Sequence, residues 1–100
     1  MDIVEMSKVL ANKSRVDILH WLKKPEDNFP KQVNVPSFDD GVCVCHIQDK
    51  TGLSQSTTSH YLSMLEKAGL LTSTRIGKWT YYKRDEAVIE QYLRYLTHQL

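Results

Sequence analysis

Two cysteines separated by a single residue have the most distinctive chemistry in this sequence. Cys43 and Cys45 are followed at once by His46, which places an imidazole beside the two thiols. Thiolates and imidazoles bind soft metal ions, and a thiol pair can also be oxidised to a disulfide. A free cysteine is just as often a small buried apolar residue. Cys43, Cys45 and His46 are therefore a candidate metal site, a candidate redox site, or part of the core.

The spacing of the two cysteines limits how they act together. Side chains at positions i and i+2 of a helix point about 200° apart. Both sulfur atoms can reach one ion only if the start of such a helix is distorted. A disulfide between them would close a small strained ring, which makes the bond easy to reduce.

A second group of residues has side chains suited to contact with nucleic acid. Ser54 is a good N-cap and Gly69 a good C-terminal stop, which predicts a helix over residues 54–68. Its inner side is expected to hold Thr58, Leu62 and Leu65. Its outer side carries hydrogen-bonding side chains and no acid: Gln55, Ser56, Thr57, Ser59, His60 and Ser63. Such side chains bond to base edges and phosphates, although an ordinary solvated helix face has a similar composition.

A β-hairpin is predicted directly after that helix. Residues 70–76 and 79–84 are rich in Thr, Ile, Tyr and Trp and are separated by a Gly-Lys turn. Arg75 and Lys78 flank the turn, where long cations can contact a DNA backbone or enter a minor groove. The alternative is a solvated hairpin whose aromatic side chains pack across the strands.

Positive charge is concentrated in the same part of the chain. The whole sequence has a net charge of +1, but residues 50–84 carry six basic residues against Glu66 alone. The segments before and after them each have a small negative net charge. A local basic patch of this kind is the minimum footprint of a phosphate-binding surface.

The remaining elements must position these residues. Apolar spacing predicts helices over residues 2–11 and 12–24, and a last helix that begins after Asp85. Residues 25–41 are expected to form a long loop. Residues 42–51 suit strand or helix, and their neighbour favours a helix, because two helices joined by a glycine turn form a helix-turn-helix.

We therefore expect one domain over residues 1–100, mainly α within the α+β class. Its predicted fold is a winged helix-turn-helix with five helices and a two-stranded β-hairpin wing. The apolar residues of the last helix spread over more than one face, and a 100-residue chain has only a modest core. Both features favour a homodimer.

The composition also excludes several functional classes. No segment approaches the roughly 20 apolar residues of a membrane span, and the first residues do not resemble a signal peptide. We expect a cytoplasmic protein with no membrane partner. The sequence lacks suitably spaced carboxylates, a glycine-rich phosphate loop, or a nucleophile with an evident base. We therefore expect that it is not an enzyme.

Taken in order, these motifs resemble the ArsR-type (ArsR/SmtB) winged helix-turn-helix transcriptional repressors. The resemblance covers nearly the whole chain except residues 25–41 and runs through Leu10–Leu19, Cys43–Cys45, Gly52–Leu62 and Arg75–Tyr82. It implies a homodimer that binds a palindromic operator in double-stranded DNA through recognition helix 54–68 and wing 75–80, and that leaves the operator when an inducer binds.

The resemblance further implies a dimer built on the first and last helices. The candidate dimer residues are Ile3, Met6, Ile89, Tyr92, Leu93 and Leu96. A zinc site found on the last helix of some relatives is incomplete here. Asp85 and His98 are present, but Ala87 stands where a histidine is expected, and tetrahedral zinc needs four donors.

The inducer stays open at this point. Many members of the family hold arsenite or a soft metal ion with thiolates at this helix. Here Gln48 stands where the arsenic repressors have a third cysteine. Arsenite, a soft metal ion and oxidation are the candidate signals at Cys43 and Cys45, and no cofactor is certain. The alternatives are a winged-helix module that binds protein and an ArsR-like regulator that has no metal or redox inducer.

Overall fold

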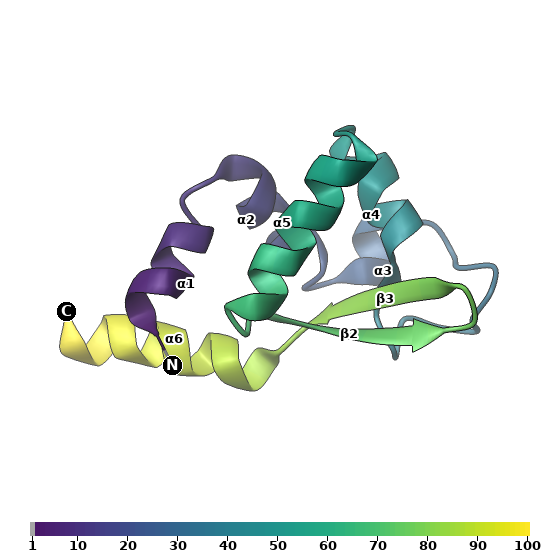
Figure 1. The fold of residues 1–100 in the computed structure, drawn as a ribbon. Coiled ribbons are helices and arrows are strands. Elements are labelled where there is room, and N and C mark those ends of the chain that lie inside the picture. The colour runs from purple at the N-terminus through teal and green to yellow at the C-terminus, as the bar shows by residue number, and fades with distance from the viewer. Residues whose placement is uncertain (1) are drawn as a thin grey trace.

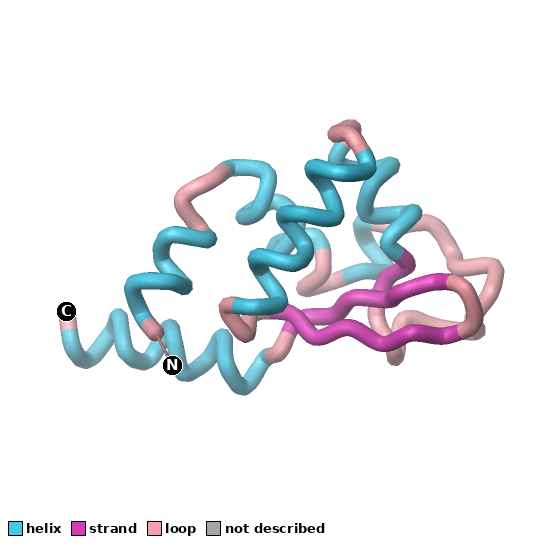
Figure 2. Tube along the Cα trace, in the orientation of Figure 1, coloured by secondary structure: helices cyan, strands magenta, loops and turns pink. Residues whose placement is uncertain are grey.

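The computed structural model describes residues 2–100, which form six helices and one small antiparallel sheet (Figures 1 and 2). In chain order the elements are α1 (Ile3–Val9), α2 (Lys13–Trp21), α3 (Pro25–Asn28), β1 (Val42–Cys43), α4 (Val44–Thr51), α5 (Gln55–Lys67), β2 (Leu71–Ile76), β3 (Trp79–Arg84) and α6 (Glu86–Gln99). Helices α1 and α6 lie at one end of the molecule and the hairpin tip lies at the other (Figure 1). The predicted winged helix-turn-helix is confirmed.

Helices α4 and α5 form the predicted helix-turn-helix. Helix α4 ends at Gly52, whose φ of 69° is left-handed and suits glycine. Ser54 then caps α5 by accepting a hydrogen bond from the Thr57 N–H at 3.1 Å. The buried side of α5 holds Thr58, Leu62 and Leu65 as predicted. These residues join Met6, Ile18, Ile47, Leu70 and Ile89 in the core.

The wing is larger than the expected two strands. Strands β2 and β3 form the predicted hairpin, which closes where Ile76 pairs with Trp79. Strand β1 adds a third strand on the other side of β3, with Val42 opposite Tyr82 and Cys43 opposite Tyr81. The cysteine segment therefore begins as a strand and continues as a helix, so both readings of residues 42–51 hold in part.

A sixth helix forms where only a loop was expected. Helix α3 is a single turn that begins at Pro25, where the missing N–H of proline costs nothing because no helical partner exists there. The side-chain amide of Asn28 donates to the carbonyls of Trp21 (3.2 Å) and Lys24 (2.9 Å). Proline at the first position and these local hydrogen bonds, rather than apolar periodicity, make this turn, so the expected count of five helices was wrong.

The first two helices are shorter than expected. Asp2 caps α1 by accepting from the N–H groups of Val4 and Glu5. Helix α2 begins after its predicted cap, Asn12, and ends at Trp21 instead of Lys24. Lys24 precedes a proline, which pushes its backbone away from helical values.

The last helix packs beside the first. Asp85 caps α6 through the Val88 N–H at 3.2 Å. The hydroxyls of Ser7 on α1 and Tyr92 on α6 are hydrogen-bonded at 2.9 Å. Within residues 2–100, no helix has the length and apolar character needed to cross a membrane.

Candidate nucleic-acid interface and thiol site

The outer side of α5 is open to solvent over most of its predicted contact residues. Gln55, Ser56, Ser59 and His60 are exposed, whereas Thr57 and Ser63 are half-buried. The Ser54 hydroxyl donates to the Thr57 hydroxyl at 2.9 Å, so Thr57 is partly engaged in the helix cap. The exposed side chains can exchange hydrogen bonds with base edges and can donate to phosphate oxygens.

The two predicted wing cations are also exposed and lie next to the hairpin turn. The Arg75 Nε donates to the Gly77 carbonyl at 3.1 Å, which holds this side chain along the turn. Lys78 follows in the turn, and the Trp79 side chain is 38% exposed beside it. The tip therefore offers two cations and an aromatic surface at the end of the molecule far from α6 (Figure 1).

The first turn of α5 contains no acidic residue. Glu66, the one acid of this helix, lies at its C-terminal end. Its carboxylate accepts a hydrogen bond from the Ser73 hydroxyl at 2.6 Å and so faces strand β2. The first turn of α5 therefore adds no negative charge of its own at the positive end of the helix dipole, where anions bind.

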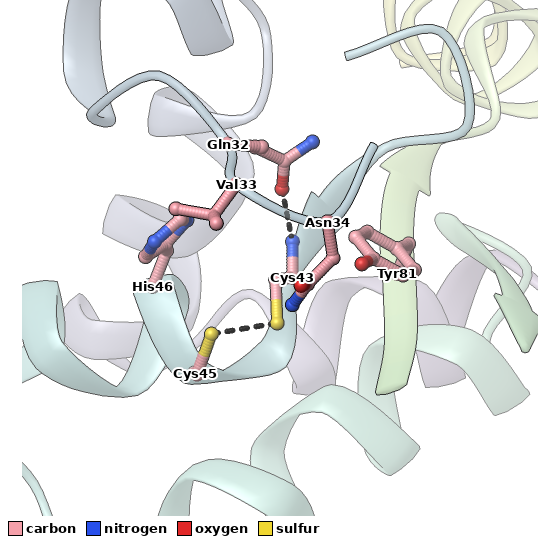
Figure 3. Close-up of a pocket in the computed structure, with 7 residues that line it drawn as sticks. All are labelled: Gln32, Val33, Asn34, Cys43, Cys45, His46 and Tyr81. Carbon is pink, nitrogen blue, oxygen red and sulfur yellow. Dashed lines mark hydrogen bonds between the residues drawn. The ribbon is translucent and has the colours of Figure 1, made fainter. Parts of the chain in front are cut away.

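The two thiols meet at the junction of strand β1 and helix α4. Their Sγ atoms are 2.6 Å apart and point toward one another (Figure 3). Cys43 has extended backbone angles (φ −56°, ψ 136°), and Cys45 lies in the first turn of α4. The strand-to-helix change between them removes the angular separation expected for two helical residues. Both sulfur atoms can therefore reach one ion, or each other.

A cavity of about 160 Å³ adjoins the thiol pair, and Tyr81 of β3 and residues 32–34 of the long loop line it (Figure 3). Partial burial, and then the adjacent Cys43 thiol, raise the pKa of Cys45 to about 11 from its ordinary value of 9.0. Both thiols are free. At neutral pH the Cys45 thiol is protonated, so a metal ion or an arsenical must displace its proton on binding.

Gln32 is a structural residue of this site that the sequence did not reveal. Its buried amide donates to the carbonyls of Ser37 (2.9 Å) and Gly41 (3.1 Å) and accepts from the Cys43 N–H at 2.8 Å. One side chain thus folds the loop back onto strand β1. Its only signal in the sequence was a glutamine in a proline-containing loop, which is not specific.

His46 does not complete a metal site with the cysteines. Within residues 2–100, no three His, Cys, Asp or Glu side chains are grouped so that they could hold a metal ion. The His46 Nδ1 is buried without a hydrogen-bond partner among the described residues, and His46 lines the cavity. Only the two sulfur atoms, however, lie close enough together to act as a pair. Asp85 is occupied as the cap of α6 and His98 is exposed near its end, so the zinc site is not assembled within one chain.

The candidate dimer residues fall into two groups. Met6, Ile89 and Tyr92 are at most 9% exposed within the single chain, so their side chains belong mainly to its own core. Leu93 is 55% exposed, and Ile3 and Leu96 are half-buried. Val4 on α1 (57% exposed), which is not among the candidate dimer residues, and Leu100 at the end of α6 (89% exposed) add apolar surface.

Comparison with known proteins gives one family. The model described as "Bacterial regulatory protein, arsR family" matches residues 41–73, which include the thiol pair and the whole helix-turn-helix. The HTH-type transcriptional regulator YbzH of Bacillus subtilis is 44% identical over 100 residues, which is the full length of both chains.

Two further relatives extend this picture. The cadmium resistance transcriptional regulatory protein CadC of Listeria innocua is 33% identical over 75 residues, or 75% of this chain and 51% of the relative. This chain thus matches about half the length of that regulator. The homodimeric winged helix-turn-helix DNA-binding domain of Mb0332 from Mycobacterium bovis, a possible ArsR-family regulator, superposes with a TM-score of 0.66 at 25% identity. That match covers 95% of this chain and 75% of the other.

Proposed function

We propose that this chain acts as a homodimeric repressor in the cytoplasm. The premise is that it belongs to the arsR family of bacterial regulatory proteins and is a DNA-binding transcriptional regulator. Each protomer would place α5 in a major groove of a palindromic operator and its wing tip against the flanking backbone. The observation that carries this proposal is the exposed, acid-free outer side of α5 together with the exposed cations of the wing tip.

The side chains of α5 and of the wing suit different kinds of DNA contact. Gln55 can pair with the edge of adenine through both ends of its amide, and Ser56 and Ser59 can bond to bases or phosphates. Arg75 and Lys78 reach phosphates, which give affinity without sequence preference. A regulator needs both kinds of contact, because phosphate contacts alone do not choose an operator.

A second protomer is proposed on α1 and α6. Leu93, Leu100 and Val4 leave large apolar side chains exposed on these helices. A palindromic operator requires a two-fold symmetric protein. The Mycobacterium bovis domain that superposes on this chain is homodimeric, which supports the same assembly here.

The test is a titration of the reduced protein against DNA from upstream of its own gene, followed by fluorescence anisotropy. Lys78→Ala should weaken binding to all sequences and flatten the dependence on salt, because a phosphate contact releases counterions. Gln55→Ala should instead change the preference among operators, by about 1 to 3 kcal/mol for a base contact. If both variants bind like the wild type, the face is misplaced and a protein-binding module becomes the better account.

A thiol-responsive signal is proposed at Cys43 and Cys45, carried by the 2.6 Å approach of their sulfur atoms. Two thiols can condense with one trivalent arsenical, bind one soft metal ion, or form a disulfide on oxidation. Each reaction alters the junction of β1 and α4, and α4 supports α5 through the Gly52 turn. The expected consequence is a change in operator affinity.

The corresponding experiment repeats the anisotropy titration with arsenite, with cadmium ions and with hydrogen peroxide. Release of DNA that is absent in Cys43→Ser establishes a thiol sensor. Val44→Ala changes the residue between the cysteines without removing a thiol and is the matched control. Unchanged tight binding with every reagent would mean that the regulator has no metal or redox inducer and that the cysteines are packing residues.

A further inference from the structure

The relative placement of α1 and the recognition helix α5 is not determined by close packing along their whole length. A groove of about 240 Å³ opens between them, lined by Glu5, Val9, Met64, Lys67 and Ala68. Met6 and Val9 of α1 share the hydrophobic core with Leu62 and Leu65 of α5, so the core holds the inner sides of the two helices. A polar contact outside the core adds to this placement.

Arg15 makes that contact. Its Nε donates to the carbonyl of Val9, the last residue of α1, at 2.6 Å. Its guanidinium carbon also lies 4.9 Å from the centre of the Tyr61 ring, and Tyr61 belongs to α5. One partly buried cation therefore touches the end of α1 and the middle of α5 while its own backbone sits in the first turn of α2.

Each part of this arrangement is physically favourable. The Val9 carbonyl is at the negative end of α1, where a cation is stabilised by the helix dipole. The face of an aromatic ring attracts a guanidinium, more strongly when both are partly desolvated. The Arg15 backbone N–H is also fixed, because it donates to the Asn12 side chain at 3.1 Å. The guanidinium is held by two separate helices, and the Arg15 backbone is held by the cap of α2.

We propose that Arg15 is the positioning residue that sets the spacing of the two recognition helices in the dimer. The inference rests on the proposed function, since α1 and α6 must carry the partner for this spacing to matter. Arg15 acts on α5 through Tyr61 and need not contact DNA itself. Its loss would leave each recognition helix able to read a half-site and would loosen the distance between the two.

This role predicts an effect that simple structural weakening would not produce. Operator duplexes are selected from a random-sequence pool with the wild-type protein, then shortened to one half-site or altered by one base pair between half-sites. Arg15→Met should lose about tenfold affinity for the full operator, from one charged hydrogen bond and one cation–π contact. Its affinity for the isolated half-site should be unchanged, and its discrimination against altered spacing should fall.

Matched variants distinguish the effect of the Arg15 contact from a general loss of positive charge, from loss of the Tyr61 ring and from misfolding. Lys13→Met removes one positive charge from the same turn of α2 and should bind the full operator with wild-type spacing preference. Tyr61→Leu should reproduce the Arg15→Met result, whereas Tyr61→Phe keeps the ring and should not. If Arg15→Met fails to fold by circular dichroism, the pair Tyr61→Leu and Tyr61→Phe provides the same comparison from the other side of the contact.

Two results would overturn the proposal. An equal loss on half-site and full operator would place Arg15 in DNA contact or in the stability of α5, and no loss on either would deny it a role. Sedimentation velocity on the wild type separates the proposal from its premise. A monomeric wild type refutes the dimeric repressor, whereas a dimer with unaltered spacing preference refutes only the role of Arg15.

Discussion

Cys43 and Cys45 bring their sulfur atoms within 2.6 Å because the first ends a strand and the second begins a helix. The pairing of Cys43 with Tyr81 of strand β3 fixes the first sulfur, and the first turn of α4 directs the second toward it. The thiol site is thus tied on one side to the wing and on the other to the helix-turn-helix. The backbone therefore links the sulfur atoms to both elements that we propose to contact DNA.

The raised pKa of Cys45 predicts slow reaction at neutral pH. The thiolate is the nucleophile, so the rate of alkylation by iodoacetamide should keep rising past pH 9 and reach half of its maximum only near pH 11. The rate is measured by mass spectrometry on the folded, reduced protein. Cys43→Ser removes the neighbouring thiol and should move the titration of Cys45 to lower pH. A plateau already at pH 9 in the wild type would contradict the burial of this thiol.

The same shift has a consequence for stability. Cys45 titrates near 9.0 when unfolded and near 11 when folded. The unfolded chain therefore loses this proton first as the pH rises, so the contribution of Cys45 is present below pH 9 and lost between pH 9 and pH 11. The free energy of unfolding should fall more steeply over that interval in the wild type than in Cys45→Ala.

Gln32 is expected to hold the loop over the thiol pair. Gln32→Leu keeps the volume but leaves the Cys43 N–H and the carbonyls of Ser37 and Gly41 without their partner, which should cost about 3 kcal/mol. Urea unfolding gives that loss, and iodoacetamide at low urea should label the thiols faster. Gln48→Leu is the control, because no side-chain hydrogen bond of Gln48 is found within residues 2–100. Equal stability in the two variants would show that the hydrogen bonds of Gln32 do not hold the loop.

The helix-turn-helix and the hairpin were predictable because local signals specify them. Ser54, Gly52 and the spacing of Leu62 and Leu65 define α5 without any tertiary information. Three other features were not predictable: the third strand, the hydrogen bonds of Gln32 to the loop and to Cys43, and the close approach of the two sulfur atoms. Each depends on residues far apart in sequence, as in the pairing of Val42 with Tyr82. The spacing of apolar residues predicts which side of a helix or strand is buried. It does not predict which distant residues that side will contact.

The proposed dimer surface shows the same limit. An apolar residue on the last helix can face its own core or a partner, and the sequence cannot distinguish them. Tyr92 is 9% exposed and bonded to Ser7, so Tyr92→Glu should destabilise the chain itself. Leu93 is 55% exposed, so Leu93→Glu should leave thermal stability of the protomer and helical content near the wild type while dissociating the dimer.

Sedimentation velocity checks the assembly, and circular dichroism checks the fold. Gln91→Glu introduces the same carboxylate on the exposed surface of α6 outside the apolar set and should stay dimeric. Loss of operator binding should accompany dissociation, because a lone protomer contacts only one half-site. A Leu93→Glu protein that sediments as a dimer would move the interface away from this helix face.

Replacing Gly41 and Gly77 by alanine should distinguish two costs in the free energy of unfolding. One is the strain of a left-handed backbone, and the other is the collision of a new Cβ with a neighbouring strand. The φ of Gly41 is 108°, and a Cβ there would collide with the backbone carbonyl of Tyr82 in strand β3. Gly77 also has a positive φ, 62°, but a Cβ there meets only open space. Left-handed backbone alone should cost about 1 to 2 kcal/mol in Gly77→Ala. Gly41→Ala should cost about 1 to 3 kcal/mol more, because strand β1 must move away from β3. Urea unfolding of both variants gives the difference, and equal losses would mean that the approach of Gly41 to Tyr82 does not constrain the wing.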